Sequence, residues 1–219
     1  RRCGRAFVAP LHAPALEGLR TRGSANREDP LTLALLPGGN HARLDLQDVA
    51  VAAAIPEGAG ASAIFFNCDP AERTLTVVDN GSGMQRRELA RYHDIAASSK
   101  TRGEGIGFAG VGIKLGLLIS TEVFTETRRG KTHVASSWYM SSRYRAPWKW
   151  IAPLGIVAER GTAVRLTLQN ALSPLLDPGF LELTLRRHFQ PLLDPSFDEF
   201  LAAHYPGGVA IQINRRRLE

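Results

Sequence analysis

The stretch TLTVVDNGSGM, residues 74–84, joins an apolar run to two closely spaced glycines. Its first six residues are rich in β-branched side chains and have the length of a strand. The Asn-Gly pair that follows is typical of a turn, so the strand is expected to end at Asp79. The stretch therefore predicts a strand that carries a carboxylate at its end and leads into a glycine-rich loop.

The sequence on either side of this strand predicts an antiparallel hairpin and then a mixture of helices and strands. The apolar run ASAIFFN at 61–67 has strand length, and the turn sequence DPAER separates it from 74–79. We therefore expect these two strands to pair. The other expected elements, in chain order, are a short strand at 31–36, helices at 44–55, 85–92 and 111–119, a hairpin over 121–142, a strand at 162–170, helices at 178–193 and 195–205, and a strand at 208–214.

This order of elements mixes helices with antiparallel hairpins and has no regular βαβ alternation. It favours a two-layer α+β sandwich over a doubly wound parallel sheet. Residues 1–43 are rich in Arg, Ala, Gly, Pro and Leu without sustained periodicity, so we expect a poorly specified N-terminal arm there. Residues 44–219 are expected to form one domain, in keeping with the 219-residue length and the 44% hydrophobic composition.

The net charge and the cysteine content indicate which classes of binding partner and which cellular compartment are compatible with this sequence. A formal net charge of +6 is compatible with nucleic acid, an acidic membrane surface or a polyphosphate as a partner. Arginines cluster in RRCGR and INRRR at the two ends, so solvated tails account equally well for part of this charge. Two widely separated cysteines favour a reducing, cytoplasmic location. No run reaches the ~20 apolar residues that a membrane span needs.

A second glycine-rich stretch, GIGFAGVGIKLGLL at 105–118, opens an expected helix. Gly105, Gly107 and Gly110 match the dinucleotide-binding pattern G-x-G-x-x-G, but polar residues precede them where that pattern requires a buried strand. A P-loop is excluded because Lys114 is not followed by Ser or Thr. Two explanations stay open. The glycines permit a tight turn and close packing, or the helix N-terminus holds phosphates with its free N–H groups.

The two glycine-rich stretches together favour a nucleotide ligand. Asp79 can accept a hydrogen bond from the exocyclic amine of a purine, and Gly81 and Gly83 leave bare backbone against which a flat base can lie. The segment at 105–114 supplies backbone N–H groups and a helix dipole for phosphates. We therefore expect adenine at the first stretch and the phosphates of ATP at the second.

Four motifs in a fixed order resemble the ATP-binding domain of the GHKL superfamily. This superfamily includes gyrase, the heat-shock-ninety chaperones, histidine kinases, MutL and MORC proteins, and the chaperone, MutL and MORC branch is the most similar. The resemblance covers residues 44–168, with 169–219 as a C-terminal extension. It implies a Bergerat-type fold, in which helices cover one face of a mixed, mainly antiparallel sheet. The motifs are VVDNGSGM at 77–84, IAASSKTR at 95–102, GIGFAGVGIK at 105–114 and RGTAVRL at 160–166.

The resemblance also implies roles for individual residues. Asp79 would accept the adenine amine, Met84 would pack on the base, and Thr162 would reach toward the adenine side. Lysines in the second and third motifs would neutralise phosphate charge. Ordinary alternatives stay open for Lys114 as a solvated helix lysine, Met84 as core packing and Ser99 as a cap. The full set assigned to ATP binding is Asp79, Gly81, Gly83, Met84, Ser99, Lys100, Gly107, Gly110, Val111, Gly112, Lys114 and Thr162.

One element of the superfamily pattern is degenerate in this chain. Members carry a helix with a glutamate that activates water and, four residues later, an asparagine that holds magnesium. Direct alignment places Val51 and Ile55 at these positions, and a short insertion moves them to Asp48 and Ala52. Phosphoryl transfer depends on a metal and a water-orienting group. ATP hydrolysis is therefore doubtful, Asp48 is a weak catalytic candidate, and Mg²⁺ has no assigned ligand.

Three explanations of this degeneracy stay open. The domain has lost turnover and keeps nucleotide binding, or Asp48, Glu57 or a partner chain supplies the missing group, or the N-terminal sequence is altered or truncated. The resemblance implies that ATP acts as a conformational ligand, which orders a lid and favours association with a second copy.

A different function is suggested by SSWYMSSRYRAPWKW at 136–150. Its aromatic residues alternate with Arg and Lys, a mixture that can stack on single-stranded nucleic acid and neutralise its charge. The alternative function is a basic nucleic-acid-binding module with a vestigial nucleotide pocket. Aromatics that complete the core would explain the same pattern. The residues concerned are Trp138, Tyr139, Arg143, Tyr144, Arg145, Trp148, Lys149 and Trp150.

Overall fold

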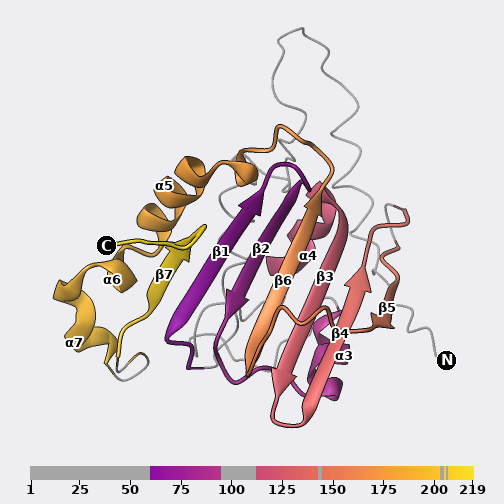
Figure 1. The fold of residues 1–219 in the computed structure, drawn as a ribbon, viewed down its shortest axis with the longest axis horizontal. Helices are drawn as coiled ribbons and strands as arrows, with labels where there is room; N and C mark the ends of the chain where they lie inside the picture. The colour runs from indigo at the N-terminus through magenta and orange to yellow at the C-terminus, as the bar shows by residue number, and fades with distance from the viewer. Residues whose placement is uncertain (1–59, 95–111, 143–144, 203–204, 206) are drawn as a thin grey trace, which may run out of the picture.

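The computed structural model describes residues 60–94, 112–142, 145–202, 205 and 207–219. Within them, eight strands form one sheet in the order β5-β4-β3-β6-β2-β1-β7-β8 (Figure 1). Neighbouring strands are antiparallel except β1 and β7, which run parallel. The strands are β1 (Ala63–Asp69), β2 (Thr74–Asp79), β3 (Ser120–Arg129), β4 (Thr132–Trp138), β5 (Trp148–Ile151), β6 (Gly161–Leu168), β7 (Ala210–Ile213) and β8 (Arg216–Arg217).

Helices form the second layer of the fold. In Figure 1, α3 and α4 lie behind the sheet, and α5, α6 and α7 lie along the side of the sheet where β7 is. This is the α+β sandwich with a mixed, mainly antiparallel sheet that the sequence predicts. No helix in the described part of the chain is long and apolar enough to cross a membrane. The helices are α3 (Arg86–Tyr92), α4 (Gly112–Ile119), α5 (Pro178–His188), α6 (Gln190–Leu193) and α7 (Asp198–Leu201), with 3-10 turns η1 (Pro174–Leu176) and η2 (Pro195–Phe197).

The β1–β2 hairpin decides which way Asp79 points. In its antiparallel register, Phe66 lies opposite Val77, and Ile64 lies opposite Asp79. Directly opposed side chains share a face of a sheet, and side chains two residues apart in a strand share it too. Asp79 therefore lies on the same face as Phe66 and Val77, which pack in the core with side chains from α4 and α5. The predicted hairpin is confirmed, and its terminal carboxylate faces the helix layer.

Other elements agree with the sequence prediction. The helix expected at 85–92 is α3, the hairpin expected over 121–142 is β3 and β4, and the strand expected at 162–170 is β6. In α3, Gln85 and Glu88 form a capping box that satisfies the first free N–H groups. Figure 1 shows β6 between β2 and β3. The strand therefore lies between the two hairpins and joins them into one sheet.

Two predictions for the C-terminal part are wrong. The single helix expected at 178–193 is interrupted at Phe189, whose φ of −116° and ψ of 20° end α5 before α6 begins. Pro191 explains the interruption, because proline has no N–H donor and its ring clashes with a preceding helical turn. The helix expected at 195–205 is the 3-10 turn η2 followed by the short α7. Strand β5 and the parallel pairing of β7 with β1 were not expected.

Candidate functional site

Asp79 is the centre of the candidate site. Its side chain is on the helix-facing side of β2, and the residue is only 3% exposed. The oxygen Oδ1 accepts the Gly81 N–H at 2.7 Å, and Oδ2 accepts the Thr162 N–H at 3.1 Å. Burial raises the pKa of Asp79 to about 6, although these backbone hydrogen bonds oppose the rise. The carboxylate is therefore mostly ionised at neutral pH in a largely dry position.

The start of β6 lies against the end of β2. Gly161 has φ of +122°, and a Cβ atom there would stand 2.0 Å from the Asp79 carbonyl oxygen. A side chain cannot be accommodated at this distance, so glycine lets the two strands approach closely. This approach brings the Thr162 N–H to Asp79. The sequence assigns Thr162 to the site, and the structure adds a packing role for Gly161, which precedes Thr162 in the motif RGTAVRL.

The loop after β2 is held against β3. Gly83 has φ of +67°, and a Cβ atom there would stand 2.2 Å from the Arg128 carbonyl oxygen. The next N–H, from Met84, donates to Thr127 Oγ1 at 2.7 Å. Gly83 is therefore required by close backbone packing, in addition to the proposed space for a base. The same hydroxyl of Thr127 lies 3.0 Å from the Gly161 carbonyl oxygen.

Thr127 is a site residue that sequence reasoning missed. It is fully buried on β3 and lies 3.2 Å, oxygen to oxygen, from the Thr162 hydroxyl. Val123, Thr125 and Thr127 alternate along β3 on the core-facing side, in register with β6. The sequence signal of Thr127 is a polar side chain at a core-facing position of a strand. Buried polar groups are almost always hydrogen-bonded, so such a position indicates a structural contact.

Asn80 fixes the other side of the same loop. Its Oδ1 accepts the N–H groups of Ser62 at 2.9 Å and Ala63 at 3.0 Å, and its Nδ2 donates to Ser62 Oγ at 2.9 Å. The end of β2 is thereby tied to the start of β1. Together with the Met84 contact, these bonds hold the 80–84 loop at both ends, so the position of the Asp79 carboxylate is well determined.

The described residues contain one half of the predicted site. Five of the predicted residues lie at the ends of β2 and β6 and in the loop between β2 and α3; Gly81 and Thr162 bond the Asp79 carboxylate, and Gly83 and Met84 pack on β3 and β6 beside it. Gly112 and Lys114 belong to α4, for which the backbone alone is described at these positions. Ser99, Lys100, Gly107, Gly110 and Val111, and the weak catalytic candidate Asp48, lie outside the described residues. The five residues that come together are Asp79, Gly81, Gly83, Met84 and Thr162.

A metal site does not emerge from the described part of the chain. Among these residues, no three His, Cys, Asp or Glu side chains are gathered in a way that could hold an ion. The Asp79 carboxylate accepts one backbone N–H on each oxygen.

A separate cavity of about 570 Å³ opens on the other face of the sheet. Phe65 and Val78 line it, and it borders Asp79 at the end of β2. Along their strands Phe65 and Val78 alternate with the core-facing residues, so this cavity and the Asp79 carboxylate are on opposite faces. Residues 156–160 form its other wall.

Glu126 holds that wall in place. It is fully buried on β3, and its carboxylate accepts the Leu154 N–H at 2.8 Å, the Val157 N–H at 3.0 Å and a contact from His133 Nε2 at 2.9 Å. Burial alone would raise the pKa of Glu126, but the hydrogen bonds from His133 and the backbone outweigh it and lower the pKa. Glu126 thus anchors the segment that leads into Gly161.

The three tryptophans in 136–150 pack α3 against the sheet, whereas Tyr139 is 41% exposed and Arg143 and Tyr144 lie outside the described residues. Trp138 is buried and donates its indole N–H to the Ala146 carbonyl oxygen at 2.9 Å. Trp148 stacks on His93 with 4.1 Å between ring centroids, and the guanidinium of Arg86 lies 4.0 Å from the Trp150 ring centre. These contacts agree with the explanation that the aromatics complete the core. They lend no support to the nucleic-acid alternative.

Comparison with known proteins agrees with the geometry of the site. The family described as histidine kinase-, DNA gyrase B- and HSP90-like ATPase matches residues 50–147. The protein named chaperone protein HtpG, from Alkalilimnicola ehrlichii, is 32% identical over 134 residues, which cover 55% of this chain and 20% of the relative. The chain thus spans about a fifth of the length of this curated relative.

Proposed function

Because residues 50–147 belong to the GHKL superfamily of ATP-binding domains, we propose that this chain binds ATP between its sheet and its helix layer. Adenine lies against Asp79 and Met84, and the phosphates lie toward α4 and the glycine-rich segment that leads into it. The observation that carries the proposal is the buried Asp79 carboxylate, held by one backbone N–H on each oxygen.

The hydrogen-bonding capacity of Asp79 fits an adenine amine. Each carboxylate oxygen has two lone pairs, and the described structure uses one acceptor site on each, through Gly81 and Thr162. A further N–H donor can therefore bind without displacing either backbone group. A charged acceptor in a buried position makes a stronger hydrogen bond than a neutral one. This single contact can therefore favour adenine over bases that present no N–H donor at this position.

ATP acts in this proposal as a conformational ligand. The match to a relative named as a chaperone supports a role in which the nucleotide controls shape and association. ATP binding orders the glycine-rich segment and favours a homodimer. Hydrolysis is slow, because the two positions that should supply the water-activating acid and the magnesium ligand carry Val51 and Ile55, or Asp48 and Ala52.

Calorimetric titration with a non-hydrolysable ATP analogue tests the proposal. Asp79→Asn puts an amide NH₂ in place of one acceptor oxygen, so we expect affinity to fall about 10–100-fold. Asp69→Asn is the matched control, because Asp69 also ends a strand and caps the following turn through the N–H groups of Ala71 and Glu72. Equal affinity in wild type and Asp79→Asn would remove the adenine assignment.

The same titration with and without magnesium distinguishes a domain that binds magnesium together with ATP from a nucleotide sensor that does not hydrolyse ATP. Affinity that depends on magnesium would mean that a carboxylate or amide outside the expected positions holds the ion, with Asp48 and Glu57 as the first residues to replace. Equal affinity in both conditions would favour a nucleotide sensor without turnover. A steady-state phosphate-release assay on the same protein then measures hydrolysis directly.

A further inference from the structure

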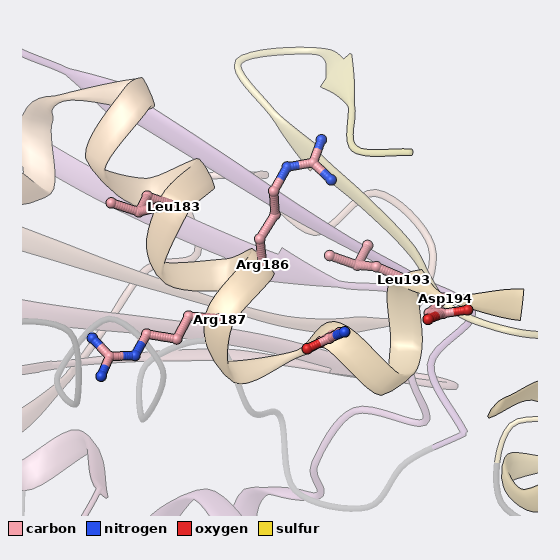
Figure 2. Close-up of a pocket in the computed structure, with 6 residues that line it drawn as sticks. Leu183, Arg186, Arg187, Leu193 and Asp194 are labelled. Carbon is pink, nitrogen blue, oxygen red and sulfur yellow. The ribbon is translucent and has the colours of Figure 1, made fainter. Parts of the chain in front are cut away.

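Helix α5 has one buried side and one side that lines a hollow. Leu181 and Leu185 are fully buried against the core, whereas Leu183 is 65% exposed. Leu183, Arg186 and Arg187 stand at positions i, i+3 and i+4, so they share one face of the helix. Together with residues of α6 and its C-cap, this face lines a hollow of about 510 Å³ (Figure 2). The lining residues are Leu183, Arg186, Arg187, Gln190, Leu193 and Asp194.

The arginine-rich segment INRRR, at 213–217, forms the turn between β7 and β8 next to α5. Asn214 Oδ1 accepts the Cys68 N–H at 2.9 Å, and its Nδ2 donates to the Cys68 carbonyl oxygen at 3.3 Å. Leu218, directly after the segment, is 3% exposed and donates its N–H to the Ile211 carbonyl oxygen at 2.8 Å. The segment is therefore a fixed hairpin rather than a solvated tail.

One carboxylate joins this hairpin to α5. Glu182 on α5 pairs with Arg186 at 3.0 Å and also with Arg216 on β8. Arg186 donates in addition to the Glu219 carbonyl oxygen at 2.6 Å. Because Arg216 and Arg186 share Glu182, Arg216 lies next to the residues that line the hollow. A single carboxylate between two guanidinium groups leaves one positive charge in excess, and the two arginine side chains are 44% and 63% exposed.

Arg187 adds a further positive charge to the hollow. It makes no ion pair within the described part of the chain, and Figure 2 shows its side chain extending from the helix. The hollow also contains Asp194, whose carboxylate accepts the Ser196 N–H at 3.0 Å and the Ser196 hydroxyl at 2.6 Å. The charge of Asp194 is thus directed to its own turn, and the arginines are left to attract an anionic partner.

The chemistry of the hollow fits a ligand that is both anionic and apolar. Leu183 and Leu193 supply an apolar part, and the volume falls within the ~300–1,000 Å³ of typical ligand sites. Guanidinium groups bind carboxylates through two parallel hydrogen bonds. A nucleic-acid backbone matches the arginines but not the apolar part. A flat membrane surface matches the exposed leucine but does not enter a hollow, so an acidic polypeptide segment fits best.

We propose that this α5–β8 surface, defined by Leu183, Arg186, Arg187, Leu193 and Arg216, binds an acidic segment of a partner protein. An apolar side chain of that segment lies between Leu183 and Leu193, and the carboxylates on either side of it pair with Arg187 and Arg216. Apolar burial supplies most of the affinity, because exposed ion pairs contribute only about 0–1 kcal/mol each, and the charges select the partner. The surface contains none of the residues of the proposed ATP site, so this proposal does not rest on nucleotide binding.

Fluorescence anisotropy with a labelled peptide, in which leucines alternate with pairs of glutamates, tests this proposal on the full chain. We expect saturable binding to wild type, and about tenfold weaker binding to Leu183→Glu and to Arg187→Glu. Leu172→Glu is the control for the leucine, because Leu172 is 89% exposed and lies outside the surface. Arg91→Glu is the control for the arginine, because Arg91 also lies in the last turn of a helix. Absence of saturable binding to wild type, or equal losses in the control variants, would overturn the proposal.

Further ligands separate the acidic peptide from other anionic partners. A peptide with serine in place of each leucine should bind about tenfold more weakly. A labelled single-stranded oligonucleotide, and vesicles of phosphatidylserine and phosphatidylcholine, should bind wild type more weakly than the leucine-containing peptide does. Tighter binding of either one that is lost in Arg187→Glu would mean that the surface recognises phosphate, which would overturn the proposal. The Asp79→Asn protein should bind the peptide like wild type, so a failure of the ATP proposal is distinguishable from a failure of this one.

Discussion

Thr127 on β3 accepts the Met84 N–H at 2.7 Å, and its hydroxyl lies 3.0 Å from the carbonyl oxygen of Gly161 on β6. One buried side chain thus joins the loop that follows β2 to the strand that supplies the Thr162 N–H. The two segments that surround the Asp79 carboxylate are therefore positioned by a third strand. This arrangement makes the geometry of the site sensitive to a residue that does not contact the carboxylate.

The first prediction concerns the Thr127 hydroxyl. Thr127→Val keeps the shape of the side chain but leaves the buried Met84 N–H without its acceptor, which should cost about 1–3 kcal/mol of unfolding free energy. We also expect weaker binding of the ATP analogue, because the 80–84 loop loses one of its two attachments. Urea unfolding and calorimetry measure the two effects. Thr127→Ser retains the hydroxyl and should bind the analogue like wild type, and equal losses in both variants would contradict a role for the hydrogen bond.

The second prediction concerns Gly83. Gly83→Ala would place a Cβ atom 2.2 Å from the Arg128 carbonyl oxygen at a φ of +67°, so the backbone must move, and we expect a loss of about 3 kcal/mol or more. Gly130→Ala is the matched control, since Gly130 has φ of +59° and open space around it. It should cost only about 1 kcal/mol. Similar melting temperatures for the two variants would mean that conformational strain, and not the close approach to β3, explains Gly83.

Local sequence patterns account for what could be predicted around Asp79. The β-branched run at 74–79 and the Asn-Gly turn after it depend on neighbouring residues alone, and they gave both the strand and the position of the carboxylate. Thr127 becomes a site residue through the register of β3 with β6, and the packing role of Gly161 comes from its close approach to the end of β2. Both relationships join segments that are distant in the sequence. The parallel pairing of β7 with β1 was missed for the same reason.

The C-terminal helices show a different kind of error. The sequence at 178–193 predicts one helix, but it contains Pro191, and a proline ordinarily ends a helix that precedes it. The break at Phe189 turns the chain and places η2 and α7 beside α6. Predictions for Ser99, Lys100, Gly107, Gly110, Val111 and Asp48 stay predictions, since these positions lie outside the described residues.

The third prediction concerns Glu126. Glu126→Gln replaces one acceptor oxygen by a donor beside the Leu154 and Val157 N–H groups, so we expect a loss of about 1–3 kcal/mol at pH 7. The folded-state pKa of Glu126 is lowered. The ionised group therefore stabilises the fold above the unfolded pKa, and this contribution disappears as the pH falls through the folded pKa. The difference between wild type and Glu126→Gln should shrink in acid.

Glu122→Gln provides the control for Glu126. Glu122 lies on the same strand and face and bonds to Ser137, but it is exposed, so its replacement should cost less than about 1 kcal/mol. Chemical unfolding of the three proteins at pH 7 and pH 4 gives the comparison. A Glu126→Gln protein as stable as Glu122→Gln at pH 7 would mean that the segment at 154–157 is not held by this carboxylate.

The fourth prediction concerns the protonation of Asp79. Its pKa is raised from 3.8 to about 6, so between these pH values the folded state holds more protons than the unfolded state. Stability from the neutral carboxyl is therefore fully present below pH 3.8 and is lost as the pH rises through about 6. The unfolding free energy of wild type relative to Asp79→Asn should fall by as much as ~3 kcal/mol from pH 4 to pH 7. A difference that is flat with pH would contradict the raised pKa.

The same linkage predicts proton release on nucleotide binding. An adenine N–H donor favours the ionised carboxylate, so bound ATP should lower the pKa of Asp79 and expel its proton near pH 6. Calorimetry of the ATP analogue in two buffers of different ionisation enthalpy counts these protons. The Asp79→Asn variant binds the same nucleotide, with the same phosphates, but lacks the titrating carboxyl. Any protons that wild type releases in excess of this variant therefore come from Asp79. Equal proton release from both proteins would contradict the proposed hydrogen bond between Asp79 and adenine. The phosphates would then account for the whole pH dependence.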